Sequence, residues 1–283
     1  MVKAWWPGNG TLYRVGIASV CISLTGIILR GFICPNDGGR YDVFKSNWCG
    51  WIIAGLSACS SPTFGPVSTN HGSDLSGLTI TDNGDGTFTF SDGGTPISTV
   101  VSYNSNVGGF VIGVAPTGGD LIHSAQTPSN AGSMLLFVSQ SFDVDGVRLE
   151  RVGETVLPGG SATFTGHFAL QNYLTANRAP TGAVEGDITL VVDFGAGTVA
   201  GGMSNATGFA TDTDYSHFEV SFEETSIVNG GFSGATVANG DNQAGTYDGL
   251  FVGANGEEAI GHFTYLRSSG TDRRRGIFWA ESP

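Results

Sequence analysis

The chain contains few cysteines, and all of them lie near its start. Four of its 283 residues are Cys, and none follows Cys59. The remainder of the chain can therefore hold no disulfide, no cysteine metal site and no thiol nucleophile. Lysine is confined in the same way, because the last one is Lys45.

Basic charge is scarce beyond residue 58. Of 12 basic and 25 acidic residues, residues 1–58 hold 5 and 2, so 7 and 23 remain and residues 59–283 carry a net formal charge of −16. Such a surface repels nucleic acid and anionic membranes, so we expect no nucleic-acid partner. Solubility accounts for this charge, and a basic protein partner is the alternative. The single basic cluster, Arg273–Arg275, is expected to be a solvated turn that opens the last strand, and pairing with nearby acidic residues is the alternative.

Long hydrophobic runs are also lacking. Val15–Leu29 is shorter than the roughly 18–20 residues that a spanning helix needs. A second run, Trp48–Ala58, follows Lys45 and ends at Cys59. A basic residue, an apolar stretch and small residues before a cleavage point are the order of a secretion signal. Leu56–Cys59 resembles a bacterial lipobox, in which the cysteine is acylated and becomes the mature N-terminus.

The lipobox divides the first part of the chain. Residues 1–58 are interpreted as the signal region, and residues 59–74 as the lipidated cysteine and a tether. A signal should begin a chain, so residues 1–42 are interpreted as a start codon assigned too early, with Val43 as the true start. The alternative retains Val15–Leu29 as an anchor.

The residue after Cys59 is Ser60. In Gram-negative lipoproteins Asp at this position commonly retains the protein at the inner membrane. The resemblance therefore implies the outer membrane.

Amphipathic helices are not evident after residue 60, whereas glycine is abundant, with 45 in the chain. Regular turn signals predict an all-β protein. We expect a small β handle domain at residues 75–157 and a water-soluble, eight-stranded, antiparallel up-and-down β-barrel at residues 160–283, divided at Pro158–Gly160. The handle is small for a core of its own but able to pack on the barrel.

Glycine and aromatic residues alternate on one face of Gly245–Gly253, and the pattern resumes after the turn Ala254–Gly256. Period two predicts two strands joined as a hairpin. Glycine on this face leaves room for a ring from across a filled interior. Eight strands are predicted to start near Ser161, Asp187, Thr198, His217, Gly231, Thr246, Glu257 and Arg274.

Closure of the barrel follows from the need to remove exposed sheet edges. The first strand has Phe164 and Phe168 on one face, and Arg275–Ala280 is the last strong β pattern. We expect residues 161–170 to pair antiparallel with residues 275–281.

Signatures of catalysis are lacking. No nucleophile elbow, phosphate-binding loop or dinucleotide fingerprint occurs, so we expect no enzyme and no catalytic residues. The histidines form no zinc-type cluster, so no metal site is expected, and His167, His217 and His262 fall on outward strand faces, where we expect them to be exposed. His123 lies in a predicted loop and is the candidate ligand should haem bind; no other cofactor is expected.

The hairpin carries a family resemblance. Gly256, Glu258, Gly261 and Phe263 fit a Gly-x-Glu-x-x-Gly-x-Phe-like pattern, and the upstream strand is Gly-aromatic. This resembles the C-terminal barrel of transferrin-binding-protein-like surface lipoproteins, a group that includes factor-H-binding protein and haemophilin-like haem carriers.

The resemblance implies an outer-membrane, surface-exposed lipoprotein. It would bind a host or environmental ligand, an iron-carrier protein or haem, and pass it to an outer-membrane transporter. No ligand-binding residues carry over, because contacts vary within the group. The alternatives are a structural or adhesive envelope lipoprotein and an uncharacterised hydrolase.

Lipidation at Cys59 is directly testable. Radiolabelled palmitate should enter the protein, and Cys59→Ala should abolish the label because it removes the acylated thiol. Label that persists in the variant would refute the assignment.

Overall fold

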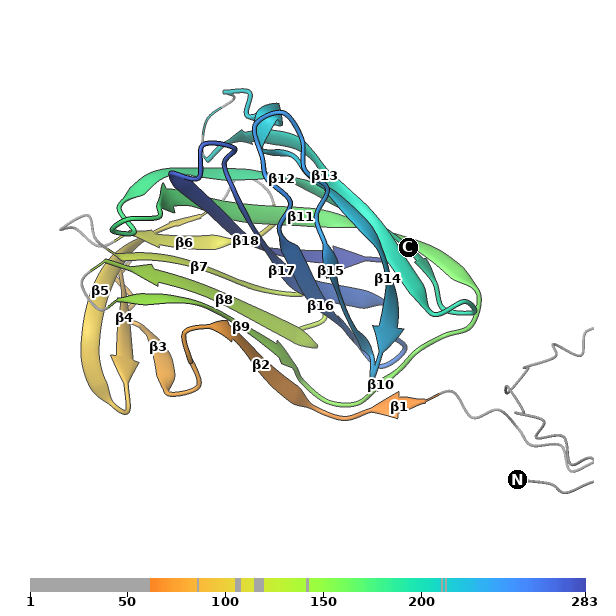
Figure 1. Ribbon diagram of the computed structural model, residues 1–283. Helices are drawn as coiled ribbons and strands as arrows, with labels where there is room; N and C mark the ends of the chain where they lie inside the picture. Colours follow the sequence, from red (N-terminus) through yellow and green to blue (C-terminus); the bar gives the residue numbers. More distant parts are fainter. Residues whose placement is uncertain are drawn as a thin grey trace, which may run out of the picture. The chain divides into compact units, whose positions relative to one another are not determined.

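The computed structural model describes residues 62–283 except 86, 105–107, 115–119, 141–142, 210 and 212. The predicted signal region 1–58 and Cys59 lie outside the described residues. The rest is almost entirely β-structure and contains a closed eight-stranded barrel beside an eight-stranded open sheet, which confirms the predicted fold class (Figure 1). None of the helices in the described part of the chain has the length and hydropathy needed to cross a membrane.

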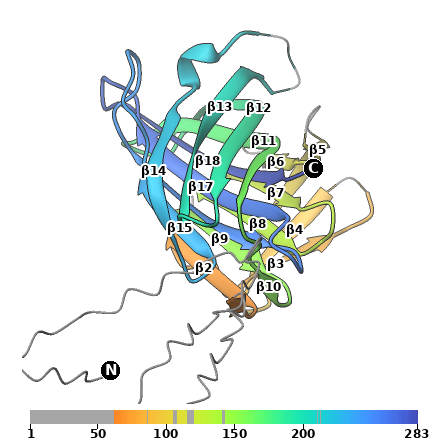
Figure 2. The ribbon, with the colours of Figure 1, turned by 90° about the vertical axis from the view of Figure 1, so that its right-hand side faces the viewer.

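The barrel strands follow one another in chain order, each antiparallel to the next (Figure 2). They are β11 (Ser161–Leu174), β12 (Pro180–Asp193), β13 (Thr198–Gly208), β14 (Ser221–Val228), β15 (Gly231–Ala235), β16 (Thr246–Val252), β17 (Glu258–Leu266) and β18 (Asp272–Glu281). β11 pairs with β18 from Thr165 opposite Glu281 to Leu174 opposite Asp272. The predicted closure is therefore confirmed, but the paired segment of β11 is shifted, since it begins at Thr165 instead of residue 161 and ends at Leu174.

Aromatic side chains fill the barrel interior. Phe164, Phe168, Phe251 and Phe278 are fully buried in one cluster with the aliphatic residues of β12. Gly261 leaves room for an aromatic ring, because a Cβ there would lie 2.2 Å from Cζ of Phe278. This ring comes from the paired neighbouring strand and not, as predicted, from across the interior. Such a filled interior is typical of small eight-stranded barrels.

Two predicted strand starts are wrong. The strand expected to start near Asp187 is β12, which begins at Pro180. The segment near His217 is a short 3-10 helix (η1, Ser216–Phe218), and β14 begins at Ser221. The helix turns Phe218 onto the guanidinium of Arg274, whose Cζ lies 3.6 Å from the ring centroid. A cation stacked on an aromatic face is stabilised by the ring quadrupole.

Arg274 and Arg275 are both buried in β18, so the expectation of a solvated basic turn is wrong for these two residues. The alternative of pairing with a nearby acidic residue holds for Arg275, which forms an ion pair with Asp145.

The handle is a second antiparallel sheet with the strand order β2-β9-β8-β7-β6-β5-β4-β3. Its strands are β2 (Val67–Gly72), β3 (Leu78–Asp82), β4 (Thr87–Asp92), β5 (Thr95–Asn104), β6 (Val111–Val114), β7 (Asp120–Gln126), β8 (Gly132–Ser139) and β9 (Val144–Arg151). A two-stranded sheet of β1 (Thr63–Phe64) and β10 (Thr155–Val156) adjoins it.

Two segments of the handle sheet differ from the sequence prediction. Residues 67–72, assigned to the tether, form β2 and pair with β9 from Val67 opposite Arg151 to Gly72 opposite Gly146. Alternate β2 residues are half-buried, so this segment has a packed face that its polar composition concealed. The segment around His123, expected to be a loop, is β7.

Handle and barrel share a core. Ile260 and Ile277, on the outside of the barrel, belong to one buried cluster with Leu136 and Val147 of the handle. Contact is close, because a Cβ on Gly132 of β8 would lie 2.9 Å from Cγ2 of Ile260. Residues 61–283 accordingly form a single compact unit.

A buried carboxylate reinforces this junction. Glu258 of β17 is 3% exposed and accepts hydrogen bonds from the backbone N–H (2.9 Å) and the hydroxyl (2.5 Å) of Ser129, in the β7–β8 turn. Hydrogen bonds to a charged acceptor are stronger than neutral ones, so this contact fixes the turn against the barrel.

The shared core predicts unequal costs for two similar truncations on the barrel exterior. Ile260→Ala should lower the free energy of unfolding by about 2–5 kcal/mol, because it opens a cavity under the handle. Val191→Ala, at a position 57% exposed, should change it by less than about 0.5 kcal/mol. Urea unfolding measures both, and equally small losses would contradict handle docking.

Candidate functional site between the handle and the barrel

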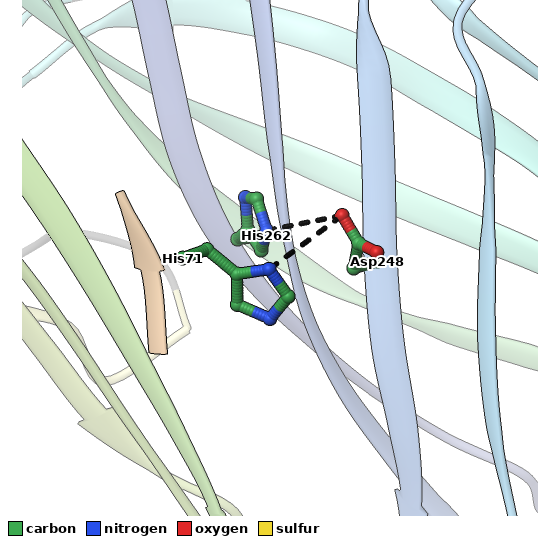
Figure 3. A group of neighbouring side chains, drawn as sticks. All are labelled: His71, Asp248 and His262. Atoms are coloured by element: carbon green, nitrogen blue, oxygen red, sulfur yellow. Dashed lines mark ion pairs between the residues drawn. The ribbon is translucent and has the colours of Figure 1, made fainter. Parts of the chain in front are cut away.

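Three strands bring a carboxylate and two imidazoles together where the handle meets the barrel. Asp248 of β16 lies directly opposite His262 of β17, so both side chains share the outer barrel face. Their neighbours Tyr247 and Phe263 point inward, as the period of two requires. His71 reaches the same place from β2 (Figure 3).

The three side chains are in close contact. Oδ2 of Asp248 lies 3.2 Å from Nε2 of His262 and 3.8 Å from Nδ1 of His71 (Figure 3). The two imidazole rings are 4.1 Å apart between centroids, at an interplanar angle of 50°. The cluster thus joins one handle strand to two barrel strands.

Burial controls the charge state of the cluster. The His262 side chain is 3% exposed, whereas those of His71 and Asp248 are 26% and 24% exposed. Burial, assisted by the neighbouring His262, lowers the pKa of His71 to about 4. Burial also lowers the pKa of His262, although Asp248 opposes this.

Burial acts in the opposite direction on the pKa of the Asp248 carboxyl group. Burial raises the pKa of Asp248, but contacts with His262 and Ser233 outweigh burial and leave the pKa below its ordinary value. At neutral pH the cluster therefore consists of two neutral imidazoles and one carboxylate.

An ion-pair network lies beside the cluster. Arg275 of β18 donates to the backbone oxygen (2.9 Å) and to Oδ1 (2.6 Å) of Asp145 in β9. The hydroxyl of Tyr173 lies 2.9 Å from both carboxylate oxygens of Asp145, and burial raises its pKa. Gly72, at φ +86°, gives Arg275 access, because a Cβ there would lie 2.9 Å from its Nη1.

A groove of about 350 Å³ opens onto the cluster. His71 and Asp248 line it together with Leu149 of the handle and Phe232 and Leu250 of the barrel. The chain thus places a carboxylate and an imidazole in the wall of a mainly apolar groove.

Two histidines that the sequence analysis names lie in environments other than the predicted ones. His123 is fully buried in β7, and its Nε2–H donates to Oε1 of Gln171 at 3.2 Å. Its role as a haem ligand stays a prediction. His262 was expected to be exposed and is buried, because the handle covers that part of the barrel.

The sequence pattern does not indicate that His71, Asp248 and His262 come together. His71 was hidden in the predicted tether, and it is 177 and 191 positions from its two partners. A signal was nevertheless present: Leu250–Val252 and Ala259–Ile260 are continuous apolar runs, which are typical of strands buried on both faces.

Comparison with protein-family models and with curated proteins gives no match. Among solved structures, the chain is similar to a mutant of transferrin-binding protein B from Haemophilus parasuis, at 15% identity and a TM-score of 0.43 over 77% of this chain and 45% of that one.

The chain is also similar to transferrin-binding protein B of Neisseria meningitidis, at 11% identity and a TM-score of 0.36 over 77% of this chain and 44% of that one. A third similarity is to the N-lobe of lactoferrin-binding protein B of Moraxella bovis, at 11% identity and a TM-score of 0.33 over 78% of this chain and 98% of that one. The chain spans less than half the length of the two transferrin-binding proteins. These are the proteins that the hairpin pattern resembles, and the likeness concerns the fold.

The enclosed His123 predicts loss of stability in acid. Burial lowers its pKa to about 4, against about 6.5 in an unfolded chain, so the unfolded state gains protons first as the pH falls. Protonation of His123 in the unfolded chain should therefore lower the free energy of unfolding by about 2 kcal/mol as the pH falls from 7 to 5. His123→Gln should remove that part of the drop.

The matched control for this prediction is His217→Gln, which replaces an exposed histidine and should leave the pH profile unchanged. Urea unfolding at both pH values provides the measurement. Parallel profiles for the native protein and His123→Gln would contradict the assignment.

Proposed function

We propose that this chain is a lipid-anchored binding protein on the outer surface of a Gram-negative cell, where it captures an iron source, either an iron-carrier protein or haem. The observation that carries the proposal is the open groove at the handle–barrel junction. It is a concave, mainly apolar surface with a few convergent polar groups, as ligand-binding sites usually are.

The filled barrel supports binding on the outside. Fully buried aromatic side chains occupy its interior, so the barrel acts as a rigid scaffold that displays its outer strands. Phe232 and Leu250 supply apolar contact area in the groove, and Val228 at its side is 63% exposed. Exposed apolar residues beside a groove are typical of interaction sites.

Attachment to the cell surface rests on the sequence. The lipobox-like Leu56–Cys59 lies close before β1, which begins at Thr63. A lipid on Cys59 would hold this end at the membrane, and the net charge of the chain opposes adhesion of its folded part to anionic lipid.

A binding role fits the cluster better than catalysis does. Ser233 interacts with Asp248 rather than with a histidine nitrogen. A serine nucleophile needs a base on its hydroxyl, and a carboxylate that orients the histidine cannot replace it. We therefore propose a binding protein and not a hydrolase.

The proposed partner is an iron-carrier protein or haem. The solved structures named above are called transferrin- and lactoferrin-binding proteins. For this chain, an iron carrier of that kind is proposed together with haem, and an outer-membrane transporter would be the recipient. The competing function is a structural or adhesive envelope lipoprotein.

Capture experiments distinguish these functions. Immobilised protein should bind iron-loaded transferrin, lactoferrin or haem saturably, with a Soret shift in the case of haem. Val228→Asp should weaken binding at least about tenfold, because it places a charge beside the groove.

Val191→Asp is the matched control, since Val191 is also an exposed barrel valine but does not line the groove. It should bind like the native protein. Failure to bind any of these carriers or haem would contradict the iron-source proposal and favour the structural function.

A further inference from the structure

We propose that His71, Asp248 and His262 bind a divalent transition-metal ion, with Zn²⁺ as the representative, and that the ion joins the handle to the barrel. Two imidazoles and one carboxylate are a recurrent donor set for such ions. The proposal goes beyond the capture of an external ligand, because it concerns a site made by the chain's own side chains.

The donor atoms have a suitable spacing. One ligand atom from each residue lies within 4.8 Å of the other two. A tetrahedral ion with bonds of about 2.0–2.1 Å holds its ligands roughly 3.4 Å apart. The separations of 3.2 and 3.8 Å from Asp248 to the two histidines bracket this value, so small side-chain rotations complete the site.

The buried histidine carries an independent sign of a ligand. Nδ1 of His262 has no hydrogen-bond partner, and Nε2 lies 3.2 Å from Asp248 in an ion pair without hydrogen-bond geometry, although the side chain is 3% exposed. Leaving a buried polar group without a partner costs about 1–3 kcal/mol, and such groups in native proteins call for an explanation. Coordination through Nε2 provides one.

Local charge also favours a cation. The cluster supplies one carboxylate and two imidazoles, and metals coordinate the deprotonated forms of these groups. Arg275 faces the cluster and opposes a positive ion, but Asp145 accepts its hydrogen bonds at 2.6 and 2.9 Å. Together these groups carry a net charge of −1.

The groove leaves a coordination position accessible. His71 and Asp248 line it, so water or a small external ligand could occupy a fourth position. Calcium and magnesium prefer sets of oxygen ligands, whereas imidazole suits zinc and its neighbours in the first transition series. The inference is therefore restricted to that class of ion.

Metal titration tests the site on the whole purified protein, prepared without a polyhistidine tag and treated with a chelator. Zn²⁺ should bind with one equivalent in calorimetry, and Co²⁺ should give visible ligand-field bands. The thermal unfolding temperature should rise by several degrees, because the ion binds only when handle and barrel are in contact.

His71→Ala is the informative variant, because His71 is partly exposed and belongs to none of the buried hydrophobic clusters of the described residues. Loss of an outer partner of a ligand costs 10–100-fold in affinity, so loss of the ligand itself should cost at least about 100-fold. Asp248→Asn, similar in size, should behave alike. His217→Ala, which removes an exposed histidine outside the cluster, should bind as the native protein does.

Absence of saturable Zn²⁺ binding to the native protein would overturn the proposal, as would unchanged affinity in folded His71→Ala. Circular dichroism verifies that each variant is folded. Because the iron-source assay can be run on the chelator-treated protein, failure of the metal site and failure of the proposed function are distinguishable.

Discussion

The packing of the handle on the outer face of β16–β18 is the interaction on which the rest of the structure depends. These strands present aromatic residues to the barrel interior and aliphatic residues to the handle, so they are buried on both faces. The combination of these two faces makes residues 61–283 one compact unit and adds a shared apolar contact to the handle's own buried cluster, which includes Phe90 and Phe137.

The polar cluster is a consequence of the same packing. Asp248 and His262 would share an exposed strand face on a free barrel, and only the approach of β2 encloses them and adds His71. Burial then keeps both imidazoles neutral. The site is therefore a property of the junction and belongs to neither sheet by itself.

Sequence patterns were informative about the barrel because its signal is local. Period-two alternation and turn residues predicted the strands, and the need to remove edges predicted the pairing of β11 with β18. The patterns were less informative wherever a distant segment decides burial. His262 and Arg274 lie on faces that look exposed until the handle and the η1 segment cover them. In β2, half-buried polar residues resemble a tether, since no apolar run marks the strand.

The central claim is that handle and barrel are cooperative parts of one folded unit. Native-state hydrogen exchange in increasing denaturant tests it most directly, by comparing backbone amides of β8 in the handle with those of β17 in the barrel. The account predicts that both sets open with the same free energy, in one global transition. Opening of the β8 amides at a clearly lower free energy, while those of β17 stay protected, would contradict it.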